Sequence, residues 1–93
     1  MLKQEFTTQF KKDYKLAVKR GYCIEKLEYV INKLCLEQTL PPEYNDHPLQ
    51  NSKQYKNVRE CHIEPDWLLI YKIINDTLVL QLMRTGTHSD LFN

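Results

Sequence analysis

The chain has 93 residues, of which 42% are hydrophobic and 27% charged, and its formal net charge is +1. This length allows one domain with a single modest core, and no apolar run is long enough for a signal peptide or a membrane span. Three cysteines without CxxC spacing argue against a disulfide framework or a zinc site. We therefore expect one domain over residues 1–93, in the reducing cytoplasm, with no cofactor and no metal.

The charge is unevenly distributed, with +3 over residues 1–37 and −2 over the remainder. Most of the excess comes from five basic residues, Lys11, Lys12, Lys15, Lys19 and Arg20. Such a run is usually the solvated face of a helix. Clustered lysine and arginine also bind phosphates, so Lys11, Lys12 and Lys15 are candidates for binding a nucleic acid. The charge pattern alone leaves both interpretations open.

The first half of the chain has the pattern of a short strand and two helices. Residues 2–6 alternate as a strand does, and Thr7 or Thr8 is a suitable N-cap for the helix that follows. The apolar stripe of this helix is Phe10, Tyr14, Ala17 and Val18, and Gly21 should end it. A second stripe follows at Ile24, Leu27, Ile31, Leu34 and Cys35. Because few residues join the two helices, we expect an antiparallel helical hairpin.

The second half of the chain changes to a period of two residues. After Pro41–Pro42 and a polar loop over residues 43–57, strands are predicted at Val58–Ile63, Trp67–Ile74 and Thr77–Arg84. Asn75–Asp76 indicates a tight hairpin between the last two. The predicted fold is α+β, with the N-terminal helical hairpin packed on a small antiparallel sheet.

The predicted sheet gathers polar residues at one end. Counting outward from Asn75–Asp76 places Ile70 opposite Gln81 and Trp67 opposite Arg84. His62 and Asp66 lie at the neighbouring turn, and His88 and Phe92 lie on the tail just beyond. We therefore expect these side chains to converge.

This set has the groups needed to cut RNA without a metal. The reaction requires a base for the 2′-OH proton, an acid for the departing 5′-oxygen and a cation for the phosphate charge. Histidine and aspartate can supply the first two, and arginine is a good phosphate clamp. Trp67 and Phe92 can stack on unpaired bases. Each residue also has a structural alternative, since Asp66 can be a turn residue, Trp67 a core residue and Arg84 half of an ion pair.

Three longer motifs carry a resemblance to a known family. They are DHPL at 46–49, RECHIEPDWLLIY at 59–71 and RTGTHSDLF at 84–92. Together they resemble the YafQ branch of the RelE/ParE toxin superfamily. The resemblance implies a RelE-like fold and the toxin of a type II toxin–antitoxin system. It also implies a ribosome-dependent endoribonuclease that cuts mRNA in the A site. The implied partners are the ribosome, mRNA and a DinJ-like ribbon-helix-helix antitoxin, with no membrane and with DNA contacted only through the antitoxin complex.

The resemblance also implies an active site and roles within it. The implied catalytic residues are His47, His62, Asp66, Arg84 and His88, and the implied base-positioning residues are Trp67 and Phe92. Asp66 with His62 would act towards the 2′-OH, His88 would be the general acid, and Arg84 would stabilise the transition state. His47 would assist at the phosphate.

The stretch over residues 50–58 departs from the family pattern, with Asn51 and Asn57 where glycine is common. We expect this difference to affect codon preference more than catalysis. Two alternatives remain, namely a ParE-like toxin that binds DNA gyrase without catalysis and an inactive relative that only binds its antitoxin.

Overall fold

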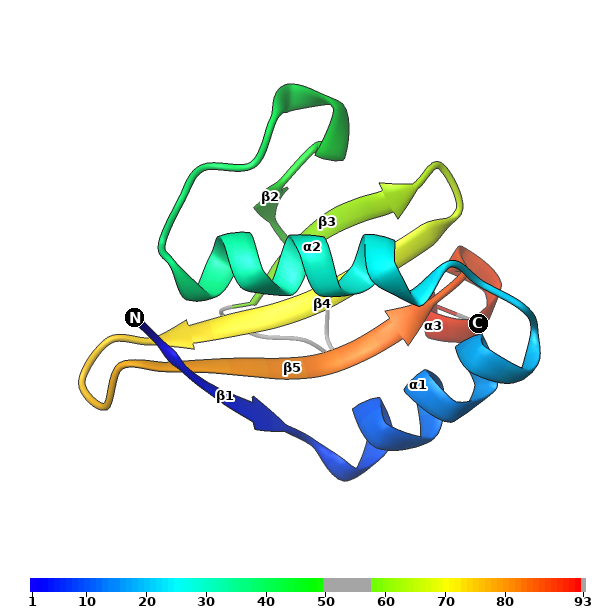
Figure 1. The fold of residues 1–93 in the computed structure, drawn as a ribbon, viewed down its shortest axis with the longest axis horizontal. Helices are drawn as coiled ribbons and strands as arrows, with labels where there is room; N and C mark the ends of the chain where they lie inside the picture. Colours follow the sequence, from blue (N-terminus) through cyan, green and yellow to red (C-terminus); the bar gives the residue numbers. More distant parts are fainter. Residues whose placement is uncertain (50–57, 93) are drawn as a thin grey trace.

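A computed structural model describes residues 1–49 and 58–92 (Figure 1). The elements in chain order are β1 (Lys3–Phe6), α1 (Thr8–Lys19), α2 (Ile24–Cys35), the 3-10 helix η1 (Pro42–Tyr44), β2 (His47–Pro48), β3 (Arg59–Glu64), β4 (Trp67–Ile74), β5 (Val79–Gly86) and α3 (His88–Phe92). Among the described residues, five strands form one sheet in the order β1-β5-β4-β3-β2. The α+β fold is therefore confirmed. Every helix in this part of the chain is too short or too polar to cross a membrane.

Helix α1 begins and ends where its sequence signals predicted. The Thr7 hydroxyl oxygen accepts a hydrogen bond from the Phe10 backbone N–H at 3.0 Å, and the hydroxyl donates to the Met83 carbonyl on β5 at 2.8 Å. Gly21 follows the helix with φ +81°, a conformation that glycine adopts without steric cost. The predicted apolar stripe is wrong at Val18, which is 52% exposed, because the helix presents Asp13 to the interior instead.

The two long helices cover one face of the sheet. Figure 1 shows α1 and α2 running in roughly opposite directions, as predicted for a helical hairpin. Leu27 and Val30 of α2 join Phe10 of α1 in one core with buried residues of β3, β4 and β5. On the opposite face, Leu91 of α3 packs in a smaller cluster with Leu68 and Ile70 of β4. Strand β4 is thus buried on both faces, as its continuous apolar sequence predicts.

The sheet differs from the prediction in two ways. It is mixed, because β1 runs parallel to β5, with Lys3 opposite Val79 and Phe6 opposite Leu82. The segment predicted as an irregular loop also contains η1 and the short strand β2, whose His47 pairs with Glu60 of β3. Strand β2 brings His47 onto the sheet beside the predicted site.

The predicted register of the β4–β5 hairpin is wrong. Ile74 pairs with Val79, so four residues form the turn, and its last residue, Leu78, has φ +53°. A second shift occurs further along, where Ile70 pairs with Arg84 although Tyr71 pairs with Leu82. This leaves one extra residue on β5, which is the arrangement of a β-bulge. Arg84 therefore lies opposite Ile70 and not opposite Trp67.

Candidate active site

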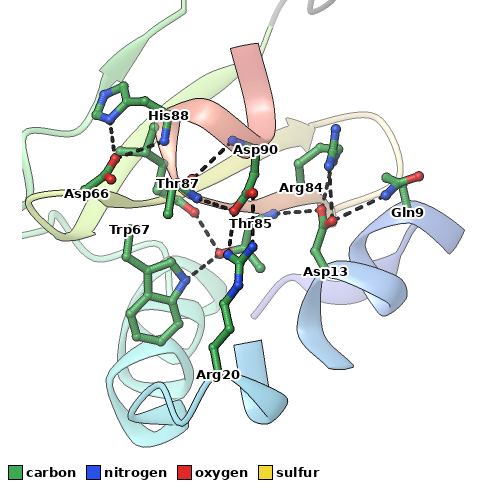
Figure 2. Close-up of polar contacts among 11 residues, drawn as sticks. Gln9, Asp13, Arg20, Asp66, Trp67, Arg84, Thr85, Thr87, His88 and Asp90 are labelled. Carbon is green, nitrogen blue, oxygen red and sulfur yellow. Dashed lines mark hydrogen bonds and ion pairs between the residues drawn. The ribbon is translucent and has the colours of Figure 1, made fainter. Parts of the chain in front are cut away.

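The β3–β4 turn and the start of α3 bring Asp66 and His88 into contact. His88 Nδ1 lies 2.6 Å from Asp66 Oδ1, and the His88 backbone N–H donates to the same oxygen at 3.0 Å (Figure 2). These contacts, first the backbone N–H and then the imidazole, lower the pKa of the Asp66 carboxyl below its usual range. Asp66 is therefore a carboxylate at neutral pH that holds the His88 ring by Nδ1. This leaves Nε2 as the nitrogen for proton transfer.

A buried carboxylate, Glu60, joins the two other histidines. Its Oε1 lies 3.3 Å from His47 Nε2 and 3.4 Å from His62 Nε2. The opposite nitrogen of each ring faces a backbone carbonyl, that of Pro48 at 2.9 Å for His47 and that of Pro65 at 3.3 Å for His62. Each ring thus has an oxygen atom close to both of its nitrogens. The contact between Glu60 and either ring is a hydrogen bond only when a proton lies between the carboxylate oxygen and the ring nitrogen. Such a cluster is well suited to exchanging protons with a substrate.

The aromatic rings of the site form a row. Ring centroids are 6.5 Å apart for His47 and His62, 5.9 Å for His62 and His88, and 6.4 Å for His88 and Phe92. The structure therefore brings together five of the predicted site residues, the four in this row and Asp66. Phe92 is 40% exposed, so its ring is open to a substrate.

Asp46 holds the DHPL segment in place. Its Oδ1 accepts hydrogen bonds from the Tyr71 hydroxyl at 2.6 Å and from Arg59 Nε at 3.2 Å. Burial raises the pKa of the Tyr71 hydroxyl, and the bond to Asp46 raises it further, so this group stays protonated as a donor. The neighbouring His47 is thereby fixed beside Glu60.

The prediction that Trp67 stacks on RNA bases is wrong for this structure. Trp67 is 3% exposed, and its ring centroid lies 4.8 Å from that of Tyr22. Its indole N–H donates to the Thr85 hydroxyl at 2.9 Å, and that hydroxyl donates to the Leu68 carbonyl at 2.7 Å (Figure 2). Trp67 is a core residue that ties β4 to β5, in agreement with the structural alternative for this position.

Trp67→Phe should therefore affect stability more than RNA cleavage. It removes one buried hydrogen bond, so we expect the free energy of unfolding to fall by about 1–2 kcal/mol. Urea denaturation would measure this loss. The rate of RNA cleavage should stay near that of the wild type at a temperature where both proteins are folded. A loss of rate of about tenfold or more under those conditions would return Trp67 to the substrate-binding residues.

Arg84 is held by Asp13 of α1. The buried Asp13 carboxylate accepts from Arg84 Nε at 2.8 Å and Nη2 at 3.1 Å, from the Thr85 backbone N–H at 3.2 Å and from the Gln9 side-chain amide at 3.3 Å. Figure 2 shows this pair and the His88–Asp66 pair on opposite sides of Asp90. The Arg84 side chain is 23% exposed, so part of it still faces solvent. Arg84 pairs with Ile70 across the sheet, and not with Trp67 as predicted.

The predicted lysines lie outside the histidine row. Lys11, Lys12 and Lys15 are exposed on α1. Lys11 and Lys15 line a groove of about 510 Å³ between β1, α1 and α2, whose apolar lining includes Phe6 and Phe10. A smaller hollow of about 230 Å³ adjoins the candidate active site and is lined in part by Asp66, Tyr22, Trp67 and Thr87. The residues 50–57, where we expected an effect on codon preference, lie outside the described residues.

Three residues of the site could hold a metal ion. His47, Glu60 and His62 each offer one ligand atom, and these atoms lie within 4.8 Å of one another. Two imidazoles and a carboxylate suit zinc, nickel or copper. When bound, such an ion supplies positive charge as a Lewis acid. The cysteine spacing argued against a zinc site, but it does not bear on this set of histidine and carboxylate ligands.

Solved structures with the same fold define the class of protein. A crystal structure of a metal-bound toxin from Helicobacter pylori matches with a TM-score of 0.92 and 44% identity, covering 99% of this chain and 100% of that one. The Escherichia coli DinJ–YafQ complex contains a chain that matches with a TM-score of 0.89 and 45% identity, with both chains fully covered. The fold is thus that of small bacterial toxins, which confirms the predicted RelE-like architecture.

Sequence comparisons give the family. The mRNA interferase toxin YafQ of Escherichia coli strain K12 is 47% identical over 90 residues, which cover 95% of this chain and 92% of that protein. The profile of the family described as "Bacterial toxin of type II toxin-antitoxin system, YafQ" matches residues 2–93. The chain belongs to this YafQ family, and the resemblance carried by its three motifs is confirmed.

Proposed function

We propose that this chain is an mRNA interferase, an endoribonuclease that cuts mRNA in the ribosomal A site and so inhibits translation in the cytoplasm. The observation that carries the proposal is the His88–Asp66 pair beside the His62 and His47 rings. Relatives that are 47–48% identical are named mRNA interferase toxins, which supports the same activity here.

Two imidazole–carboxylate pairs each carry out one of the two proton transfers. His62, in contact with Glu60, takes the 2′-OH proton as that oxygen attacks the phosphorus. His88, oriented by Asp66, gives a proton from Nε2 to the departing 5′-oxygen. The P–O5′ bond breaks, and the products carry a 2′,3′-cyclic phosphate and a 5′-OH. This assignment replaces the predicted partnership of Asp66 with His62, because the contact of Asp66 is with His88.

Other residues of the site bind the substrate. Phe92 is exposed next to His88 and stacks on a base. His47, close to Glu60, assists at the phosphate. Arg84 stabilises the charge of the transition state through the part of its side chain that faces solvent.

The partners of this function are the ribosome and an antitoxin of the DinJ type. A DinJ–YafQ complex of a relative supports the second partner. The groove between β1, α1 and α2 combines apolar walls with Lys11, Lys15 and one acidic residue, Glu28, and its two lysines suit an antitoxin segment with apolar and acidic side chains. Lys11, Lys12 and Lys15 suit ribosomal RNA equally well. DNA is contacted only through the antitoxin complex.

The chemistry of the cut ends tests this mechanism. Attack by the 2′-OH without a metal predicts 2′,3′-cyclic phosphate and 5′-OH ends. It also predicts an unchanged rate when a chelator removes zinc, nickel and copper but spares the magnesium that ribosomes need. Ends with a 5′-phosphate would contradict attack by the 2′-OH. Loss of cleavage on chelation, restored by added metal, would instead show that an ion at His47, Glu60 and His62 is required.

A further inference from the structure

Helix α3 is very short, yet it carries two of the proposed site residues. It spans only His88–Phe92, and of its residues Leu91 alone is buried. A helix this short is not stable by itself in water. Contacts from the rest of the molecule must therefore hold His88 in place.

Asp90 anchors α3 through both its side chain and its backbone. Its Oδ2 accepts from the Thr87 backbone N–H at 2.9 Å, and the Asp90 backbone N–H donates to the Thr87 hydroxyl oxygen at 3.1 Å. This reciprocal pair is a capping box at the start of the helix. The backbone of β5 passes close by, since a Cβ added at Gly86 would lie 2.9 Å from Asp90 Oδ2. Asp90 therefore has little room to move.

Arg20, at the end of α1, also binds the Asp90 carboxylate. Arg20 Nη1 donates to Asp90 Oδ2 at 2.7 Å and Nη2 donates to Oδ1 at 3.2 Å (Figure 2). This bidentate pair lowers the pKa of the Asp90 carboxyl well below its usual range, with help from the Thr87 backbone N–H. The Asp90 carboxyl group is therefore ionised at neutral pH. The planar guanidinium of Arg20 and the planar carboxylate of Asp90 fix each other's orientation.

We propose that Arg20 and Asp90 are positioning residues, whose ion pair clamps α3 to the end of α1 so that His88 stays against Asp66. His88 lies two residues from Asp90 and is held on its other side by Asp66. Neither Arg20 nor Asp90 touches the proposed reacting atoms. The clamp acts on catalysis only through the position of His88, and in that respect the inference rests on the proposed function.

The decisive variant is Arg20→Gln, examined by two independent measurements. Loss of the two-pronged guanidinium contact with Asp90 should let α3 shift. A displacement of about 1 Å at a catalytic group can lower the rate by up to about 100-fold. We expect a 10- to 100-fold lower single-turnover cleavage rate at saturating ribosomes, with ribosome binding unchanged. The second measurement is the pKa of the Asp66 carboxyl by NMR. It should rise towards its ordinary value, because the His88 backbone N–H is its largest stabilising contact.

Two further variants separate geometry from charge. Lys19→Gln removes the same charge from the neighbouring, exposed position of α1, and so measures the effect of charge alone. Arg20→Lys keeps the charge but cannot form the bidentate contact of a guanidinium. It should therefore retain only part of the wild-type rate and of the Asp66 pKa shift. If Arg20→Gln matches Lys19→Gln in both measurements, the pair is an ordinary surface ion pair and the proposal is overturned. If the Asp66 pKa rises but the wild type cuts no RNA, the clamp stands and the proposed function fails.

Discussion

His88→Ala should lower the rate of A-site cleavage by on the order of 100- to 10,000-fold, the range that one general acid or base contributes. The side chain removed is 55% exposed, so the fold should remain intact. Single-turnover cleavage on ribosomes with a defined A-site codon measures the rate, and circular dichroism checks the fold. Asp76→Ala, an exposed change in the turn at the opposite end of β4, is a suitable control.

The role of His88 as an acid can be separated from a general need for the side chain. A substrate with sulfur in place of the scissile 5′-oxygen has a leaving group that needs little protonation. If His88 protonates that oxygen, the sulfur substrate should restore most of the rate of His88→Ala. A deficit as large as with the oxygen substrate would move His88 to another role. An undiminished rate for His88→Ala would remove it from the active site.

Asp13→Ala should give the largest loss of stability among the polar residues discussed. The carboxylate is 8% exposed and accepts from Arg84, from Gln9 and from the Thr85 backbone N–H. Its removal leaves a partly buried guanidinium and a buried N–H without this acceptor. We expect the free energy of unfolding to fall by about 2–4 kcal/mol, measured by urea denaturation.

Two comparisons make this stability prediction specific. Asp13→Asn keeps a carbonyl oxygen of the same shape, so it should cost less than Asp13→Ala. Lys12→Ala, at an exposed position of the same helix, should change stability by no more than about 0.5 kcal/mol. A loss below about 1 kcal/mol in Asp13→Ala would mean that the contacts of Asp13 with β5 contribute little net stability.

The parts of the fold that depend on local signals were predictable from the sequence. The Thr7 cap and Gly21 set the ends of α1, and the apolar run of β4 gave its bounds, Trp67–Ile74. The register of β5 was not predictable in this way. It depends on a four-residue turn ending in Leu78 and on a bulge opposite Ile70, neither of which has a distinctive local sequence.

The candidate site, too, was predictable only in part. Long motifs predicted the histidines, Asp66 and Phe92 as site residues, but a period of two could not tell whether Trp67 faces the core or a substrate. The role of Glu60 could have been inferred, because strand alternation places it on the same face as His62. The ion pairs Asp13–Arg84 and Arg20–Asp90 gave no such signal. The two residues of each pair lie 70 or more positions apart in the chain, and only the folded structure brings them together.

In the proposed mechanism, the His88–Asp66 pair cuts mRNA on the ribosome. Primer extension on an mRNA bound to translating ribosomes tests it most directly, with wild type compared with His88→Ala and Asp66→Ala. We expect cuts within the A-site codon from the wild type and none from either variant at the same protein concentration. If the folded wild type makes no cuts there, the claim is contradicted, and a gyrase-binding or purely antitoxin-binding relative becomes the better description.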